Sequence, residues 1–185
     1  MTRRFAILDR DGTINEDIGY VLHPAEMKLI PGAAQAIVRL RDLGLGIVVV
    51  TNQSPIGRGL LTEQRLGDIH DRLRELLADE GASLDDIEHC PHTPDDGCTC
   101  RKPGTAMVER AAHAFGFDPA ASFLVGDHAG DMRLGRAVGA TTILVLTGHG
   151  AEECADAEPF ADHVAADLLG ASKIIRSLLD AETRT

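Results

Sequence analysis

The fold of this chain is decided by residues 5–13, which read Phe5-Ala6-Ile7-Leu8-Asp9-Arg10-Asp11-Gly12-Thr13. Four apolar residues in a row predict a short buried strand, and Gly12 allows a sharp turn after it. Because alternate side chains of a strand point to the same side, we expect Asp9 and Asp11 to project together. Such a pair could hold a divalent cation, with one carboxylate acting as nucleophile and the other as proton donor. An ordinary Asp-Gly turn after a strand is the alternative.

Length and composition limit the classes of protein to which the chain can belong. Its 185 residues are expected to form one domain over residues 1–185, with a frayed tail from about Ala181. The formal net charge of −11 argues against nucleic acid or an anionic membrane as a partner. Because no stretch approaches about 20 apolar residues and no apolar leader segment is present, we expect a cytoplasmic protein. The lack of a surplus apolar stripe favours a monomer.

Short apolar runs alternate with amphipathic stretches, which is typical of an α/β fold with a central, mostly parallel sheet. Strands are expected at Phe5–Leu8, Ile47–Thr51, Ile87–His89, Phe123–Val125 and Thr142–Leu146. Helices are expected at Gly32–Leu43, Thr62–Glu80, Thr105–Phe115, Asp131–Val138 and Leu168–Leu179. The acidic segment Glu152–Glu158 is expected to be a solvated loop or turn.

Polar side chains follow the expected strands at their carboxyl ends, where open α/β sheets bind ligands. They are Asp9 and Asp11 after the first strand, Thr51-Asn52-Gln53-Ser54 after the second, Asp127 and Asp131 after the fourth, and Arg101-Lys102 before the third helix. Taken alone, the last two acids could be a helix N-cap and a first-turn acid, and the basic pair could be a solvated surface feature. Their joint placement favours a site that cleaves phosphate esters.

Each group has a chemical role in such a cleavage. Asp9 would attack phosphorus and form an aspartyl-phosphate, and Asp11 would protonate the departing alkoxide before activating water. Mg²⁺ would be held by Asp9, the backbone carbonyl of Asp11 and Asp127. The phosphoryl oxygens would be fixed by Thr51, Lys102 and Asn52.

A cysteine-rich loop at residues 90–100 predicts a second metal site. Cys90, His92, Cys98 and Cys100 offer three thiolates and an imidazole, which match a closed tetrahedral structural Zn²⁺ site. The intervening turn formers have too little apolar content to order themselves, so zinc would supply that order. A disulfide and redox-active thiols are the alternatives. The loop ends directly before Arg101-Lys102, so that ordering it would position these cations.

These motifs resemble those of the haloacid dehalogenase (HAD) superfamily of phosphatases, in its branch of histidinol-phosphate and heptose-bisphosphate phosphatases. The four matching motifs are Asp9-x-Asp11-Gly12-Thr13, Thr51-Asn52, Arg101-Lys102-Pro103 and Gly126-Asp127-x-x-x-Asp131. The resemblance implies a Rossmann-like three-layer fold with a zinc-stabilised loop and no large cap domain, and it implies Mg²⁺ and Zn²⁺ as cofactors. It further implies substrate contacts from Asp17, Ile18, Gly19, Tyr20, Asn52, Gln53, Ser54 and Arg101.

The same resemblance bears on the substrate, a small phosphorylated molecule. The segments Gly19-Tyr20-Val21, Gly57-Arg58-Gly59 and Leu146-Thr147-Gly148 favour a heptose bisphosphate that loses its 7-phosphate during nucleotide-activated heptose biosynthesis. The short gap between the two zinc-ligand pairs is that of the histidinol-phosphate enzymes, so histidinol phosphate is the alternative substrate. An interaction module that carries zinc beside a relict site is the alternative from another class.

Overall fold

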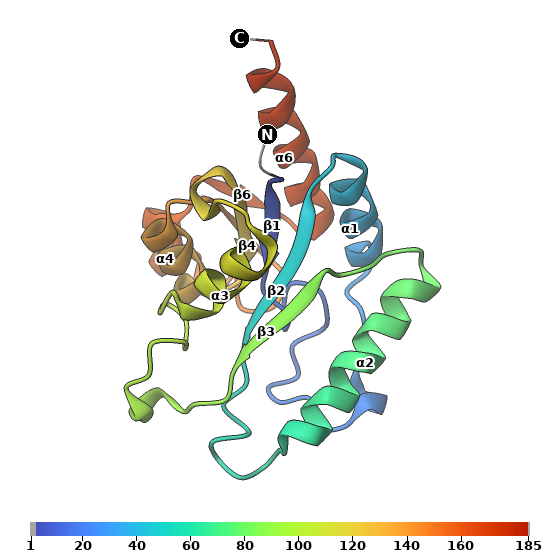
Figure 1. Cartoon of the computed structure of the whole chain (residues 1–185), viewed down its shortest axis with the longest axis vertical. Helices are drawn as coiled ribbons and strands as arrows, with labels where there is room; N and C mark the ends of the chain where they lie inside the picture. The colour runs from blue at the N-terminus through green and yellow to red at the C-terminus, as the bar shows by residue number, and fades with distance from the viewer. Residues whose placement is uncertain (1–2, 185) are drawn as a thin grey trace.

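The computed structural model describes residues 3–184, which contain a six-stranded sheet of order β3-β2-β1-β4-β5-β6 (Figure 1). The strands are β1 (Phe5–Leu8), β2 (Gly46–Asn52), β3 (Asp86–Cys90), β4 (Phe123–Gly126), β5 (Thr141–Val145) and β6 (His163–Ala165). All neighbouring strands run parallel. The chain builds the sheet outward from β1 on one side and from β4 on the other. The topological switch point, where such folds bind ligands, therefore lies between β1 and β4.

Helices cover both faces of this sheet and make the three layers of the fold. They are α1 (Ala33–Asp42), α2 (Glu63–Asp79), α3 (Ala106–Phe115), α4 (Ala129–Val138), α5 (Cys154–Ala157) and α6 (Leu168–Glu182), with short 3₁₀ helices η1 (Pro24–Glu26), η2 (Pro94–Asp96), η3 (Pro119–Ala121) and η4 (Glu158–Phe160). Alternate residues of β1 enter different cores. Leu8 packs with residues of α1, α2 and α6, whereas Ile7 packs with residues of α3 and α4. Figure 1 shows α3 and α4 on one side of the strands and α1 and α2 on the other.

The expected α/β fold is confirmed, and the differences lie in its C-terminal third. The sheet is wholly parallel in the described residues, and its sixth strand, β6, was not expected because three residues are too few to show a period. The prediction of a solvated loop or turn at Glu152–Glu158 holds for Glu152 and Glu153, which form a turn and a bend, but it is wrong for residues 154–158. That segment forms α5 and the start of η4, since the Ala157 side chain is buried and anchors it to the core.

Two helix ends also differ from the prediction. Helix α4 begins at Ala129, two residues before the expected start, because His128 caps it through a hydrogen bond from its backbone N–H to Asp131 Oδ2 (3.0 Å). Helix α6 continues to Glu182, past the expected start of fraying, and Glu182 pairs with Arg4 (2.5 Å). Thr185 lies outside the described residues. Across residues 3–184, every helix is too short or too polar to span a membrane.

Candidate active site

The site begins with a buried ion pair at the switch point. Asp9 follows β1, and its backbone N–H donates a hydrogen bond to the Val125 carbonyl of β4 (2.9 Å). Lys102 Nζ lies 2.6 Å from Asp9 Oδ1 and 2.7 Å from Asp131 Oδ1, and all three side chains are buried. Burial raises the pKa of Asp9 to about 6, although Lys102 opposes the shift. Burial also disfavours the lysine charge, yet Asp131 and Asp9 together raise the pKa of Lys102.

Asp127 adds a further carboxylate to this pair. Its Oδ2 accepts a hydrogen bond from the His149 backbone N–H (2.8 Å), whereas its buried Oδ1 has no hydrogen-bond partner within residues 3–184. Burial, reinforced by Asp9 and Asp131, raises the pKa of Asp127 to about 9. Oxygen atoms of these three carboxylates lie within 4.8 Å of one another. An unpartnered buried oxygen in a cluster of hard anionic donors fits a cation such as Mg²⁺.

Two glycines make room for the Asp127 carboxylate. Gly12 and Gly148 have φ values of 78° and 55°, in the left-handed region that side chains rarely occupy. A Cβ atom on either residue would overlap Asp127 Oδ2, and one on Gly12 would lie 2.7 Å from Asp127 Cγ. Gly12 therefore does more than turn the chain, because it lets the backbone approach the acid cluster.

Asp11 is held separately from that cluster. Its carboxylate accepts hydrogen bonds from Asn15 Nδ2 (2.9 Å) and Gln53 Nε2 (3.1 Å), and it pairs with the Arg10 guanidinium (2.8 Å). Gln53 Nε2 also donates to Thr51 Oγ1 (2.9 Å) and so connects the end of β2 to Asp11. These contacts leave the Asp11 side chain 22% exposed, at the edge of the cavity described next.

A cavity of about 350 Å³ opens over these groups. The predicted residues that line it are Asp9, Asp11, Asp17, Gly19, Tyr20, Thr51, Asn52, Ser54, Arg101 and Lys102. Two expected substrate contacts are not among the lining residues. Ile18 is 52% exposed and faces solvent, because its neighbour Asp17 takes the inward position. Asp17 accepts a hydrogen bond from Gly19 N–H (2.7 Å), and its Oδ2 lies 3.1 Å from His149 Nε2. Gln53 is buried behind Asp11.

The cavity also contains residues to which the sequence analysis assigned no role in the site. Arg58, His128, Gly130 and Asp131 line it. Arg58 is exposed and His128 is half-buried, and only the fold shows that they lie beside the other residues of the site. Asp131 was interpreted as a possible first-turn acid of a helix, and it does accept the hydrogen bond that caps α4. Its second contact, with Lys102, brings it into the site.

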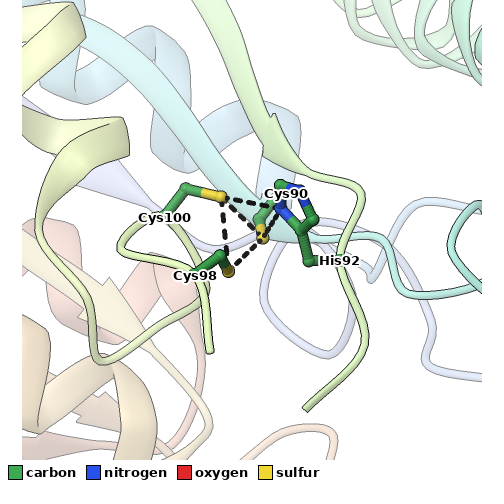
Figure 2. A group of neighbouring side chains, drawn as sticks. All are labelled: Cys90, His92, Cys98 and Cys100. Carbon is green, nitrogen blue, oxygen red and sulfur yellow. Dashed lines mark hydrogen bonds between the residues drawn. The ribbon is translucent and has the colours of Figure 1, made fainter. Parts of the chain in front are cut away.

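The cysteine-rich loop forms a compact four-residue cluster beside the cavity. Figure 2 shows Cys90, His92, Cys98 and Cys100 converging on one point from the end of β3 and the loop after it. The Cys98 sulfur lies 3.6 Å from each of the other two sulfurs, which are 2.9 Å apart, and His92 Nδ1 lies 3.2 Å from Cys100 Sγ. In a tetrahedral zinc–thiolate centre the sulfurs are about 3.8 Å apart, given Zn–S bonds of about 2.3 Å. Two of the three sulfur pairs are close to this spacing, and the donor types and their convergence within 4.8 Å fit Zn²⁺.

The same cluster contacts Arg101, the residue that precedes Lys102. Arg101 donates a backbone hydrogen bond to Cys98 Sγ (3.4 Å) and a side-chain hydrogen bond to the His92 carbonyl (3.4 Å). Desolvation acts in the opposite direction, but the hydrogen bond from Arg101 and the neighbouring thiols lower the pKa of Cys98 to about 7. The thiolate that a metal requires is thus favoured at this residue. Lys102 N–H in turn donates to Asn52 Oδ1 (3.0 Å), which joins the loop to β2.

Comparisons with known proteins agree with this geometry. A HAD-hydrolase-like family model matches residues 99–171. The chain is 44% identical over 151 residues to the D-glycero-beta-D-manno-heptose-1,7-bisphosphate 7-phosphatase of Pseudomonas aeruginosa, covering 81% of this chain and 85% of that protein. It is 44% identical over 175 residues to D-glycero-D-manno-heptose-1,7-bisphosphate 7-phosphatase of Chlorobaculum tepidum, covering 87% and 88%.

A solved structure extends the similarity to three dimensions. The D,D-heptose 1,7-bisphosphate phosphatase of Bordetella bronchiseptica, complexed with magnesium and phosphate, superposes with a TM-score of 0.88 at 38% identity and covers 94% of this chain and 98% of that one. The sequence identity, the shared fold and the carboxylate–lysine site agree with one another. The chain therefore belongs to the heptose-1,7-bisphosphate 7-phosphatase family of HAD-like phosphoric monoester hydrolases.

Proposed function

We propose that this chain is a Mg²⁺-dependent phosphatase that removes the 7-phosphate of D-glycero-D-manno-heptose 1,7-bisphosphate through an aspartyl-phosphate. One observation carries the proposal. Lys102 lies within 2.7 Å of both Asp9 and Asp131, beside the unpartnered oxygen of Asp127, at the base of an open polar cavity. This arrangement provides a nucleophile, a phosphate-binding cation and a cation site at one point. The names of the relatives favour the heptose substrate.

The first half of the reaction transfers the phosphoryl group to the protein. Asp9 Oδ1 receives hydrogen bonds from Lys102 and from the Arg10 backbone N–H (2.7 Å), so we assign the attack to Asp9 Oδ2. A bond forms between this oxygen and phosphorus while the bond from phosphorus to the sugar oxygen breaks. Asp11 donates its proton to the departing sugar oxygen, which leaves as an alcohol.

The second half restores the protein. Asp11, now a carboxylate, accepts a proton from water as the water oxygen attacks phosphorus, and the Asp9 carboxylate is released with inorganic phosphate. Lys102, Thr51 and Asn52 would hold the phosphoryl oxygens in both halves. Bound Mg²⁺ would supply positive charge that offsets the charge on the transferring group. Its proposed ligands are Asp9, the backbone carbonyl of Asp11 and Asp127.

The rest of the substrate would lie against the outer part of the cavity. Asp17 and Ser54 offer acceptors for sugar hydroxyl groups, and Tyr20 offers both a ring and a hydroxyl. Arg58 and Arg101 also line the cavity and suit a second phosphate group. We propose that Zn²⁺ bound to the cysteine–histidine cluster orders the loop that carries Arg101, in a monomeric cytoplasmic enzyme of nucleotide-activated heptose biosynthesis.

The test is phosphate release by the purified protein, measured with Mg²⁺ for both anomers of heptose 1,7-bisphosphate and for histidinol phosphate in one assay. We expect the highest kcat/KM for one heptose anomer and no release in the presence of a chelator that removes Mg²⁺. A higher kcat/KM for histidinol phosphate would assign the other substrate of the branch. Release from none of the three would contradict the proposed function.

A further inference from the structure

A buried arginine separates the two catalytic aspartates in the sequence, and the reaction described above does not use it. Arg10 is 1% exposed and is the largest by volume of the fully buried side chains within the described residues. Its Nη2 lies 2.9 and 2.8 Å from the two carboxylate oxygens of Asp11, and its Nε lies 3.2 Å from each. A guanidinium held against both oxygens restrains the rotation of a carboxylate, which a single donor cannot do.

The other end of the same guanidinium contacts a histidine on α2. Arg10 Nη1 lies 3.2 Å from His70 Nε2. Because arginine nitrogens only donate hydrogen bonds, His70 Nε2 must be the unprotonated acceptor, and the ring proton must be on Nδ1. Burial, followed by the charge of Arg10, lowers the pKa of His70 to about 3, so the ring is neutral at physiological pH. The histidine thus accepts the guanidinium hydrogen that does not face Asp11.

We propose that Arg10 and His70 are positioning residues that fix the orientation of the Asp11 carboxylate for proton transfer to the leaving group. This inference rests on the proposed function, in which Asp11 is the general acid. Asn15 and Gln53 each donate one hydrogen bond to Asp11, one to each oxygen, and Arg10 adds a charged contact to both oxygens. Arg10 thus restrains the carboxylate of Asp11, and His70, on α2, holds the guanidinium of Arg10 in place.

A purely structural role for the pair would have a different signature. Loss of a buried ion pair lowers stability and reduces the amount of active protein, so it lowers the rate for every substrate by the same factor. Misplacing a general acid instead slows the transfer of the phosphoryl group to Asp9, and only for esters whose leaving group needs a proton. An alkyl phosphate needs one, because it departs as an alkoxide, whereas p-nitrophenyl phosphate departs as a stable phenolate. The later attack of water on the aspartyl-phosphate also uses Asp11 and is common to all esters, so the first step must be measured by itself. The ratio of the rates for the two esters therefore separates the roles.

The experiment compares the rate of leaving-group release in a single turnover, with protein in excess and saturating Mg²⁺, for heptose 1,7-bisphosphate and p-nitrophenyl phosphate. We expect His70→Leu to lower this single-turnover rate for the sugar ester about tenfold, part of the roughly 10²–10⁴-fold that a general acid supplies. The aryl ester should change by less than about twofold. His70→Gln, whose amide oxygen can still accept from Arg10, should restore the ratio. Arg10→Lys, which keeps the charge without the two-pronged geometry, should repeat the selective loss.

A matched control is available in the neighbouring imidazole. His89 lies with its ring centroid 6.0 Å from that of His70 and pairs with Glu63 (2.9 Å), so His89→Leu should leave the ratio unchanged. Thermal unfolding of each variant measures any loss of stability, and Arg10→Lys carries the test if His70→Leu does not fold. An equal fall for both esters, or no fall, would overturn the inference while leaving the proposed function intact. A wild-type protein inactive on both esters would overturn both.

Discussion

A single methyl group added at Gly12 should disable the cation site. Two costs are expected for Gly12→Ala. The first is the left-handed backbone conformation at φ 78°, which costs a residue other than glycine about 1–2 kcal/mol. The second is the overlap between the new Cβ and the Asp127 carboxylate, whose Cγ lies 2.7 Å away. Relieving the overlap requires a shift of about 1 Å, and a misplacement of that size can lower a rate about 100-fold. We therefore expect weaker Mg²⁺ binding and about 100-fold lower kcat.

Gly44→Ala is the matched control for this change. Gly44 has nearly the same backbone conformation, with φ 83°, but within the described residues nothing lies within 4 Å of an added Cβ. Both variants should lose similar stability in urea unfolding without Mg²⁺, apart from the extra cost of the overlap at Gly12. Only Gly12→Ala should require more Mg²⁺ for half-maximal phosphate release. Equal Mg²⁺ dependence of the two variants would refute the reasoning that places the cation against Asp127.

Three further predictions test other parts of the site. Asp9→Asn should keep less than about a tenth of wild-type phosphate release, since covalent catalysis needs the carboxylate; a higher residual rate would remove Asp9 as nucleophile. In metal-free protein, the pKa values of about 6 for Asp9 and about 9 for Asp127 exceed the ordinary 3.8, so the native state holds protons that the unfolded state releases. Stability measured by thermal unfolding should therefore fall as pH rises from about 4 to about 9, and saturating Mg²⁺ should flatten that fall. Cys98→Ser should abolish stoichiometric zinc in elemental analysis and lower the Tm by about 5 °C or more, because each kcal/mol shifts the Tm of a chain this size by about 2–4 °C; an unchanged zinc content would contradict the ligand assignment.

The sequence predicts the edge of the sheet that carries the candidate site well, because strand ends are local features. The runs that form β1 and β2 are buried on both faces and read as continuous apolar stretches, so their ends could be placed within one residue. Parallel strands then bring these ends to one edge, whichever order they take. The cysteine–histidine cluster follows from spacing alone, since its four members lie within eleven consecutive residues. Site groups that depend only on such local features were therefore predictable.

The remaining groups depend on contacts between distant residues. Asp131 accepts a helix-capping hydrogen bond from His128, three residues away, and pairs with Lys102, 29 positions away. The sequence places Asp131 after the fourth strand but does not show its contact with Lys102. Arg10 occupies the variable position between the two aspartates, and its partner His70 is 60 residues further along the chain. Ile18 and Asp17 are adjacent in one loop, yet only Asp17 lines the cavity, because the loop turns through Gly19. No periodic pattern encodes these choices.

The charges of the site explain how a chain with a net charge of −11 can bind a phosphate ester. Three buried carboxylates, those of Asp9, Asp127 and Asp131, surround one buried ammonium. When all are ionised, two negative charges remain unbalanced, and burial makes them costly, which is why two of the acids have raised pKa values without a metal. A divalent cation bound here would balance the two negative charges and displace the protons from these acids. An incoming phosphate would then meet a cavity floor that carries no net charge, with Arg58 and Arg101 at the rim of the cavity. The local field of the site, and not the net charge, therefore decides which ligand is favoured.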